Sequence, residues 1–165
     1  MTGERKEVAP LILLVEDREE DIIIIQRAFE RTKIPAAIQP VRDGEEAIAY
    51  LQGMGPYSNR TDYPLPWLVL LDLKMPGMTG FDVLRWIRSQ PGLRRLVVVV
   101  LTSSDQIRDV NEAYALGANS FMVKPLDFDN TSALAQVIHQ YWLQHSRLPV
   151  SERDAPRKLN GGVEL

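Results

Sequence analysis

The residues best suited to chemistry in this sequence come directly after runs of apolar residues. They are the carboxylates of Glu16, Asp17 and Asp72, the hydroxyl of Thr102 and the ammonium of Lys124. Carboxylates held close together repel one another, and one of them stays protonated unless a cation joins them. A hard divalent ion with oxygen ligands, Mg²⁺ or Mn²⁺ in its place, suits such a cluster. With a hydroxyl and a lysine beside it, we expect phosphoryl-transfer chemistry in which Asp72 is the nucleophile and forms an acyl phosphate.

The elements that position these residues follow from the alternation of apolar and amphipathic stretches. Predicted strands cover Leu11–Val15, Ala36–Val41, Trp67–Leu71, Leu96–Leu101 and Asn119–Val123, and predicted helices cover Glu19–Thr32, Glu45–Met54, Gly80–Gln90, Gln106–Leu116 and Phe128–His145. Three of the strands are apolar at every position, which is typical of strands buried on both faces of a parallel sheet. The alternation predicts a doubly wound α/β domain. Because the carboxyl ends of its strands share one edge, the five side chains should converge there.

Composition narrows the class of protein further. The 165 residues fit one domain, and the 45% hydrophobic and 25% charged fractions are those of a soluble globular protein. A net charge of -3 argues against nucleic-acid binding, and the absence of cysteine excludes disulfides and cysteine-ligated zinc. No stretch resembles a secretory signal or approaches the ~18 apolar residues of a membrane span, so we expect a cytoplasmic protein without a membrane partner. We expect a flexible N-terminus over residues 1–9, a folded domain over 10–146 and a tail over 147–165 that is partly mobile or forms an interface.

Four motifs make the chain resemble the receiver domain of two-component response regulators. They are "VED" at 15–17, "LLDLKMPGMTG" at 70–80, "LTSS" at 101–104 and "FMVKP" at 121–125. The resemblance implies a flavodoxin-like (CheY-like) fold with five helices and strand order 2-1-3-4-5. It also implies a single-domain regulator that takes a phosphoryl group from a phosphohistidine of a sensor histidine kinase and signals by a conformational change. Such a protein catalyses its own phosphorylation and dephosphorylation but is not an enzyme that turns over a separate substrate.

The same resemblance implies roles for individual residues on the metal side of the site. Asp72 would be the phosphoacceptor. Asp17 and Asp72, together with the backbone carbonyl of Lys74, would hold Mg²⁺, and Glu16 would act through a bound water. Lys74 departs from common receiver patterns, where smaller or neutral residues often stand two positions after the phosphoacceptor.

On the phosphoryl side, the resemblance implies that Thr102 bonds one phosphoryl oxygen and that Lys124 pairs with another. The Lys124–Pro125 peptide would be cis, an arrangement that only proline makes inexpensive. Thr102 and Phe121 would form the switch pair. Because Phe121 lacks the hydroxyl of tyrosine, we expect the switch to act through packing.

Partners are suggested by a finer likeness and by leftover apolar residues. The segments "GPYSNRTDYPLP", "RSQPGLRRLVVVVLTSSDQ" and "YWLQHSRLP" are similar to those of free-standing regulators that partner phytochrome-type kinases, so a bacteriophytochrome is the suggested kinase. Tyr141, Trp142 and Leu143 are too broad a set for one helix face. We expect a homodimer that uses them, through either the fourth and fifth strand–helix units or the tail. One helix face also cannot bury all four isoleucines of residues 22–25, so at least one should lie at the surface.

Other classes fit the sequence less well. A phosphatase of the haloacid dehalogenase type would need an acid two residues after Asp72, where Lys74 stands. A flavin carrier would need a glycine- and hydroxyl-rich phosphate loop where "VEDREED" is acidic. The remaining alternatives are a docking module that works without phosphorylation, and a phosphate sink.

Overall fold

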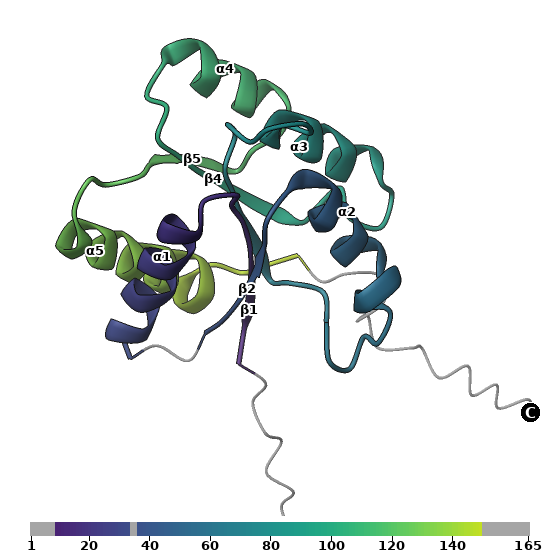
Figure 1. The fold of residues 1–165 in the computed structure, drawn as a ribbon, viewed down its shortest axis with the longest axis horizontal. Helices are drawn as coiled ribbons and strands as arrows, with labels where there is room; N and C mark the ends of the chain where they lie inside the picture. The colour runs from purple at the N-terminus through teal and green to yellow at the C-terminus, as the bar shows by residue number, and fades with distance from the viewer. Residues whose placement is uncertain (1–8, 34–35, 150–165) are drawn as a thin grey trace, which may run out of the picture.

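A five-stranded parallel sheet forms the centre of the molecule (Figure 1). The computed structural model describes residues 9–33 and 36–149. The strands are β1 (Leu11–Val15), β2 (Ala37–Val41), β3 (Leu68–Leu71), β4 (Val97–Thr102) and β5 (Ser120–Val123). Their order is β2-β1-β3-β4-β5, which confirms the predicted topology. The expected N-terminal segment 1–9 and tail 147–165 lie largely outside the described residues.

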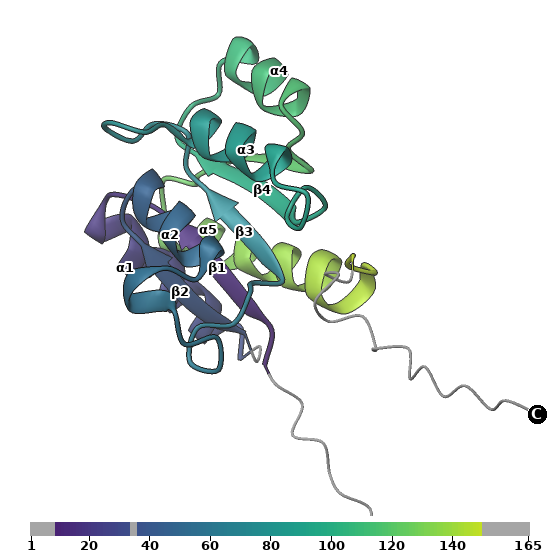
Figure 2. The same ribbon diagram turned by 90° about the vertical axis from the view of Figure 1, so that its right-hand side faces the viewer.

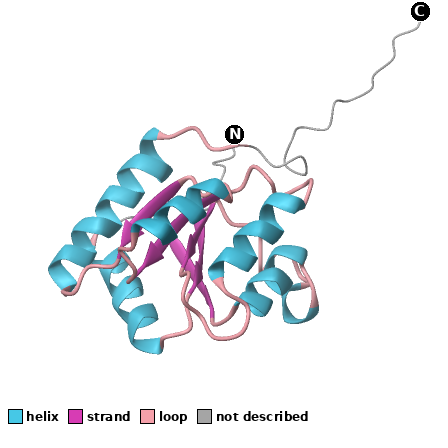
Figure 3. Ribbon diagram, turned by 90° about the horizontal axis from the view of Figure 1, so that it is seen from above, coloured by secondary structure: helices cyan, strands magenta, loops and turns pink. Residues whose placement is uncertain are grey.

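Five helices cover the two faces of the sheet, as Figures 2 and 3 show from two further directions. They are α1 (Glu19–Arg31), α2 (Gly44–Gln52), α3 (Gly80–Ser89), α4 (Ile107–Ala115) and α5 (Phe128–Ile138), with a short 3-10 turn η1 (Gly55–Tyr57) before β3. The helices α1 and α5 pack on one face, and α2, α3 and α4 pack on the other.

Strand β1 shows why the strands are apolar at every position. Ile12 and Leu14 pack with the core under α1 and α5, whereas Leu13 and Val15 pack with the core under α2 and α3. Successive side chains point to opposite faces of a strand, and both faces of this sheet are covered by helices. All four side chains are therefore buried.

The predicted elements match the observed ones to within two residues at each end, with one exception. The last predicted helix was expected to continue to His145. Instead, α5 ends at Ile138 and is followed by a π-helical segment, η2 (His139–His145). Nothing in the sequence explains this wider winding, which is rare in proteins.

The four isoleucines of residues 22–25 in α1 divide between core and surface, as expected. Ile22 and Ile25 are buried in the core, while Ile23 and Ile24 are each 39% exposed. Among the described residues, no helix is both long enough and apolar enough to cross a membrane.

Candidate functional site

The carboxyl edge of the sheet brings the predicted site residues together. The backbone N–H of Glu16 donates to Val41, and that of Asp72 donates to the carbonyl of Val15, each at 3.0 Å. These bonds extend the sheet pairing one residue beyond the strands, so the carboxylates are held by the sheet itself. Carboxylate oxygens of Glu16, Asp17 and Asp72 lie within 4.8 Å of one another.

The cation of the site is Lys124, which follows β5 and is fixed by an N–H bond to the carbonyl of Thr102 at 2.8 Å. Its ammonium forms ion pairs with Glu16, with Asp21 at 3.0 Å and with Asp72 at 3.5 Å. Burial favours the neutral amine, but the hydrogen bond to Glu16 and the charge of Asp72 outweigh burial and raise the pKa of Lys124. The lysine is therefore held in its charged form.

Glu16 is the most deeply placed carboxylate of the cluster, with no exposed surface. Burial raises its pKa to about 7, against the lowering effect of the hydrogen bond from Lys124, and the charge of Asp72 raises it further. The other oxygen of Glu16 accepts a hydrogen bond from the N–H of Arg18 at 3.1 Å. One lysine alone does not compensate all the negative charge gathered at this edge.

Two buried oxygens at this edge lack hydrogen-bond partners among the described residues. They are Oδ1 of Asp17 and Oγ1 of Thr102. A buried polar atom without a partner costs free energy, about 1–3 kcal/mol, and such atoms are uncommon in folded proteins. The two atoms belong to the residues expected to bind a metal and a phosphoryl oxygen. The all-oxygen carboxylate set therefore fits a hard divalent cation, and the free hydroxyl fits an anion beside it.

Sequence reasoning missed Asp21, which lies in the first turn of α1. It shares Lys124 with Glu16 and Asp72. Its position just beyond the acidic end of β1 is a signal that could have indicated it, because the first turn of α1 must lie near the site.

Lys74 has contacts at both of its ends. Its backbone N–H donates to Oδ1 of Asp72 at 3.4 Å, and its ammonium lies 3.1 Å from Oδ2 of Asp109 in α4. Asp109 was also missed from the sequence, where it reads as one acidic residue in an amphipathic helix.

The expected cis peptide is wrong for this structure. No peptide bond among the described residues is cis, so Lys124 and Pro125 are joined by a trans bond. The trans form is the more stable isomer of an X–Pro bond by about 0.5–1 kcal/mol.

The two proposed switch residues differ in burial. Thr102 is fully buried, whereas Phe121 is half-buried and packs at the border of the core under α2, α3 and α4. The N–H of Phe121 donates to the hydroxyl of Tyr114 in α4 at 3.2 Å. A tyrosine hydroxyl is thus present at the switch strand, supplied by the neighbouring helix.

The candidate interface residues divide between surface and core. Tyr141 is 58% exposed, while Trp142 and Leu143 are half-buried and pack against the core under α1 and α5. The rings of Tyr141 and Trp142 meet edge to face with centroids 4.8 Å apart.

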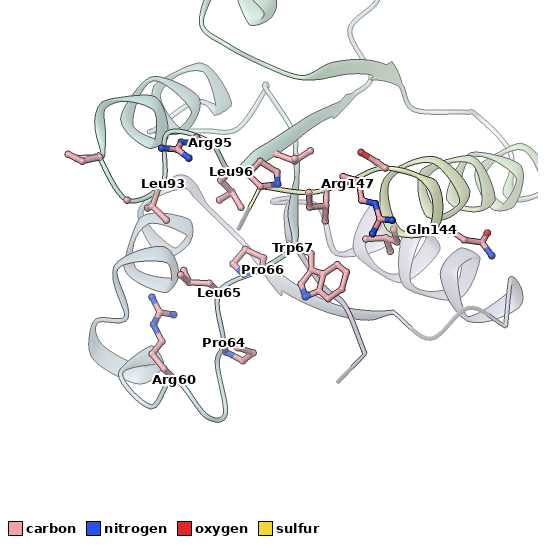
Figure 4. A pocket seen from close by; sticks show the side chains of 17 residues that line it. Arg60, Pro64, Leu65, Pro66, Trp67, Leu93, Arg95, Leu96, Gln144 and Arg147 are labelled. Carbon is pink, nitrogen blue, oxygen red and sulfur yellow. The ribbon is translucent and has the colours of Figure 1, made fainter. Parts of the chain in front are cut away.

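A cavity of about 910 Å³ has none of the acidic-site residues in its lining (Figure 4). Its lining comes from the loop before β3, the loop between α3 and β4, and the segment after Trp142, and includes Trp67, Arg95, Leu143 and Arg147. Of the predicted interface residues, Leu143 alone lines it. This cavity is therefore distinct from the acidic site.

Fold and site together define a class: a doubly wound α/β domain that gathers carboxylates, one lysine and a free hydroxyl at its carboxyl edge. The sequence model of the response regulator receiver domain matches residues 12–136, and the chain belongs to this family.

Similar proteins support this membership along most of the chain. The probable methanogenesis regulatory protein FilR2 of Methanothrix harundinacea is 40% identical over 139 residues, covering 84% of this chain and 87% of FilR2. Response regulator Rcp1 of Synechocystis sp. is 37% identical over 141 residues, covering 86% of this chain and 94% of Rcp1. The solved structure of the phosphorylated cyanobacterial phytochrome response regulator RcpA matches with a TM-score of 0.79 and 38% identity, covering 86% of this chain and 99% of RcpA. Rcp1 has also been solved in a Mn²⁺-bound form, which matches with a TM-score of 0.76 and 36% identity over 86% of this chain and 99% of that one.

Proposed function

We propose that this receiver domain accepts a phosphoryl group on Asp72 from the phosphohistidine of a sensor histidine kinase. The observation that carries the proposal is a set of polar atoms at the sheet edge where Asp72 lies. Oδ1 of Asp17 and Oγ1 of Thr102 have no hydrogen-bond partner among the described residues, and the ammonium of Lys124 lies 3.5 Å from Asp72. In the reaction, a carboxylate oxygen of Asp72 forms a bond to phosphorus while the bond from phosphorus to the histidine nitrogen breaks. The imidazole leaves, and hydrolysis by water later returns the carboxylate and free phosphate.

The residues around Asp72 orient the group and balance its charge. Lys124 is held charged within reach of Asp72 and would pair with one phosphoryl oxygen, and the hydroxyl of Thr102 would donate to another. Asp17 and Asp72, with the backbone carbonyl of Lys74, would hold Mg²⁺, and Glu16 would act through a water. The metal, when bound, neutralises charge that develops on the phosphoryl oxygens.

Mass spectrometry tests this function directly. Acetyl phosphate with Mg²⁺ should add one phosphoryl mass to the parent chain, and Asp72→Asn should gain none. As a matched control, Asp105→Asn changes an exposed carboxylate on the loop before α4 and should be labelled like the parent. A parent chain that stays unlabelled by both acetyl phosphate and candidate kinases would instead favour the docking module that works without phosphorylation.

The kinase we propose is a cytoplasmic sensor of the phytochrome type, by analogy with the relatives. RcpA is described as a phytochrome response regulator, and the bacteriophytochrome response regulator RtBRR matches with 36% identity and a TM-score of 0.68. Phosphotransfer from a purified, autophosphorylated bacteriophytochrome to Asp72 within seconds would support this partner. Equal or faster transfer from unrelated kinases would argue against it.

We further propose a homodimer through the face made by α4, β5 and α5. Each of these three elements carries exposed apolar side chains, namely Ile107 and Tyr114 in α4, Val123 in β5 and Val137 in α5. Tyr141 lies exposed in η2, just beyond α5. Sedimentation of the parent, Ile107→Ala and Val137→Ala, each with and without acetyl phosphate, checks this surface. If both variants keep the parent's association and its response to phosphorylation, the signalling surface lies elsewhere.

A further inference from the structure

Asp109 is a buried carboxylate that the acidic cluster does not include. It stands in the first turn of α4 and is 2% exposed. Its Oδ2 accepts a hydrogen bond from the hydroxyl of Ser104 at 2.5 Å and lies 3.1 Å from the ammonium of Lys74. The hydrogen bond from Ser104, followed by the one from Lys74, lowers the pKa of Asp109, so the carboxylate is charged.

The two partners of this ion pair differ in their surroundings. The side chain of Lys74 is 53% exposed, whereas that of Asp109 is 3% exposed. Asp109 is also held by α4, because its N–H donates to the carbonyl of Gln106 at 2.9 Å. Asp109 is therefore the buried partner of the pair, and Lys74 is the solvent-exposed partner.

Lys74 connects Asp109 to the phosphorylation site. It stands two residues after Asp72, and its N–H approaches the Asp72 carboxylate at 3.4 Å. Its neighbours Leu73 and Met75 are buried in the core, so Lys74 is the exposed residue of this short segment. Through its backbone and its side chain, Lys74 thus contacts both the Asp72 carboxylate and the first turn of α4.

We propose that Asp109 is a positioning residue for the metal side of the site, acting through Lys74. The ion pair orders the loop after β3, whose Lys74 backbone carbonyl is a proposed metal ligand. It thereby links metal binding on this loop to the position of the first turn of α4. This inference rests on the proposed function, because the role of the Lys74 carbonyl as a metal ligand is part of that proposal. By thermodynamic reciprocity, an anchored α4 favours the bound metal, and the bound metal favours an anchored α4.

The decisive variant is Lys74→Met/Asp109→Asn, which removes the ion pair without changing the net charge. We expect it to bind Mn²⁺ about threefold or more weakly than the parent, measured by calorimetry on the full chain. Lys74→Arg keeps a cation that can reach Asp109 and should lose less Mn²⁺ affinity than the double variant. Asp105→Asn removes a charge from the same region without touching the pair and should change the affinity by less than about twofold.

Hydrogen–deuterium exchange supplies a readout that a general loss of stability would not produce. In the parent, saturating Mn²⁺ should slow exchange at the first turn of α4, and in the double variant that slowing should be absent. Equal Mn²⁺ affinity in parent and double variant, or an unchanged response of α4, would overturn the inference. If the double variant does not fold, Ser104→Ala replaces it, because it keeps both charges and loosens Asp109; unchanged Mn²⁺ affinity there has the same meaning.

The outcomes separate this inference from the proposed function. A parent chain that neither binds Mn²⁺ nor gains a phosphoryl group contradicts both. A parent chain that does both, with a double variant that matches its Mn²⁺ affinity, contradicts only the role of Asp109.

Discussion

The ammonium of Lys124 lies 3.5 Å from Oδ2 of Asp72, and it also forms ion pairs with Glu16 and Asp21. The lysine is thus already engaged by two further carboxylates before any phosphoryl group arrives. A phosphoryl group carries about -1.5 to -2 charge and can compete for this cation. In the proposed reaction, Lys124 exchanges a carboxylate partner for a phosphoryl oxygen within a preorganised cluster.

Lys124→Met should therefore destabilise the fold as well as impair phosphorylation. The variant leaves the buried Glu16 without its cation, and removing one partner of a buried ion pair costs about 3 kcal/mol or more. Urea unfolding measures the loss. Arg42→Met is the control, because the Arg42–Glu19 pair is exposed and should contribute no more than about 0.5 kcal/mol. Equal losses in the two variants would contradict a structural role for Lys124.

Asp17→Asn should weaken divalent-metal binding and yet stabilise the metal-free protein. Oδ1 of Asp17 is buried without a partner among the described residues, and the carboxylate adds to a repelling cluster. Neutralising it should raise the free energy of unfolding by about 1 kcal/mol in the presence of a chelator. Differential scanning calorimetry with and without Mg²⁺ checks both signs. A lower melting temperature without metal would mean that the carboxylate is needed for the fold.

Gly80→Ala should distort the site from the first residue of α3. A Cβ atom at this position would lie 2.1 Å from the carbonyl oxygen of Asp72 and 2.7 Å from Cα of Leu73. The start of α3 and the segment after β3 must move apart, which should lower the free energy of unfolding by about 1–3 kcal/mol. Because this movement displaces Asp72, phosphoryl uptake from acetyl phosphate should also slow. At Gly92 the same substitution meets nothing within 4 Å among the described atoms, so Gly92→Ala should stay within about 0.5 kcal/mol of the parent. Parental stability and labelling in Gly80→Ala would disprove this close packing.

Asp82→Asn tests the capping box that starts α3. Asp82 accepts hydrogen bonds from the N–H and the hydroxyl of Thr79 at 3.0 and 2.9 Å. The bond from the Thr79 N–H is the main cause that lowers the pKa of Asp82 below its ordinary value. A carboxyl group with a lowered pKa stabilises the fold above its ordinary pKa, and this contribution is lost as the pH falls.

The variant should therefore be less stable by about 0.5–1 kcal/mol at pH 7, with solvent exposure keeping the effect small. The difference between parent and variant should shrink below about pH 4. Melting curves at pH 7 and pH 3.5 measure it, with Asp105→Asn as the control. A difference that grows at low pH would contradict this sign.

The sequence predicted the sheet and most of the site because both depend on strand ends. Apolar runs locate the strands, and the residues that follow them, such as Asp72 and Lys124, must then meet at one edge. Asp21 and Asp109 could not be identified in this way, because their partners depend on how α1 and α4 are seated on the sheet. The trans bond before Pro125 and the π-helical η2 depend on small energy differences that residue patterns do not encode.

The burial of β3 on both faces has a consequence for how the strands align. Since every residue from Leu68 to Leu71 is apolar and buried, shifting β3 by one position would exchange one apolar side chain for another. Hydrophobicity alone thus penalises such a slip weakly, through packing. A shift that draws Asp72 inward would, however, pull its carboxylate away from Lys124 and into the apolar interior, where an unpaired charge is very costly. The phosphoacceptor therefore also opposes this slip and helps to define the register of the central strand.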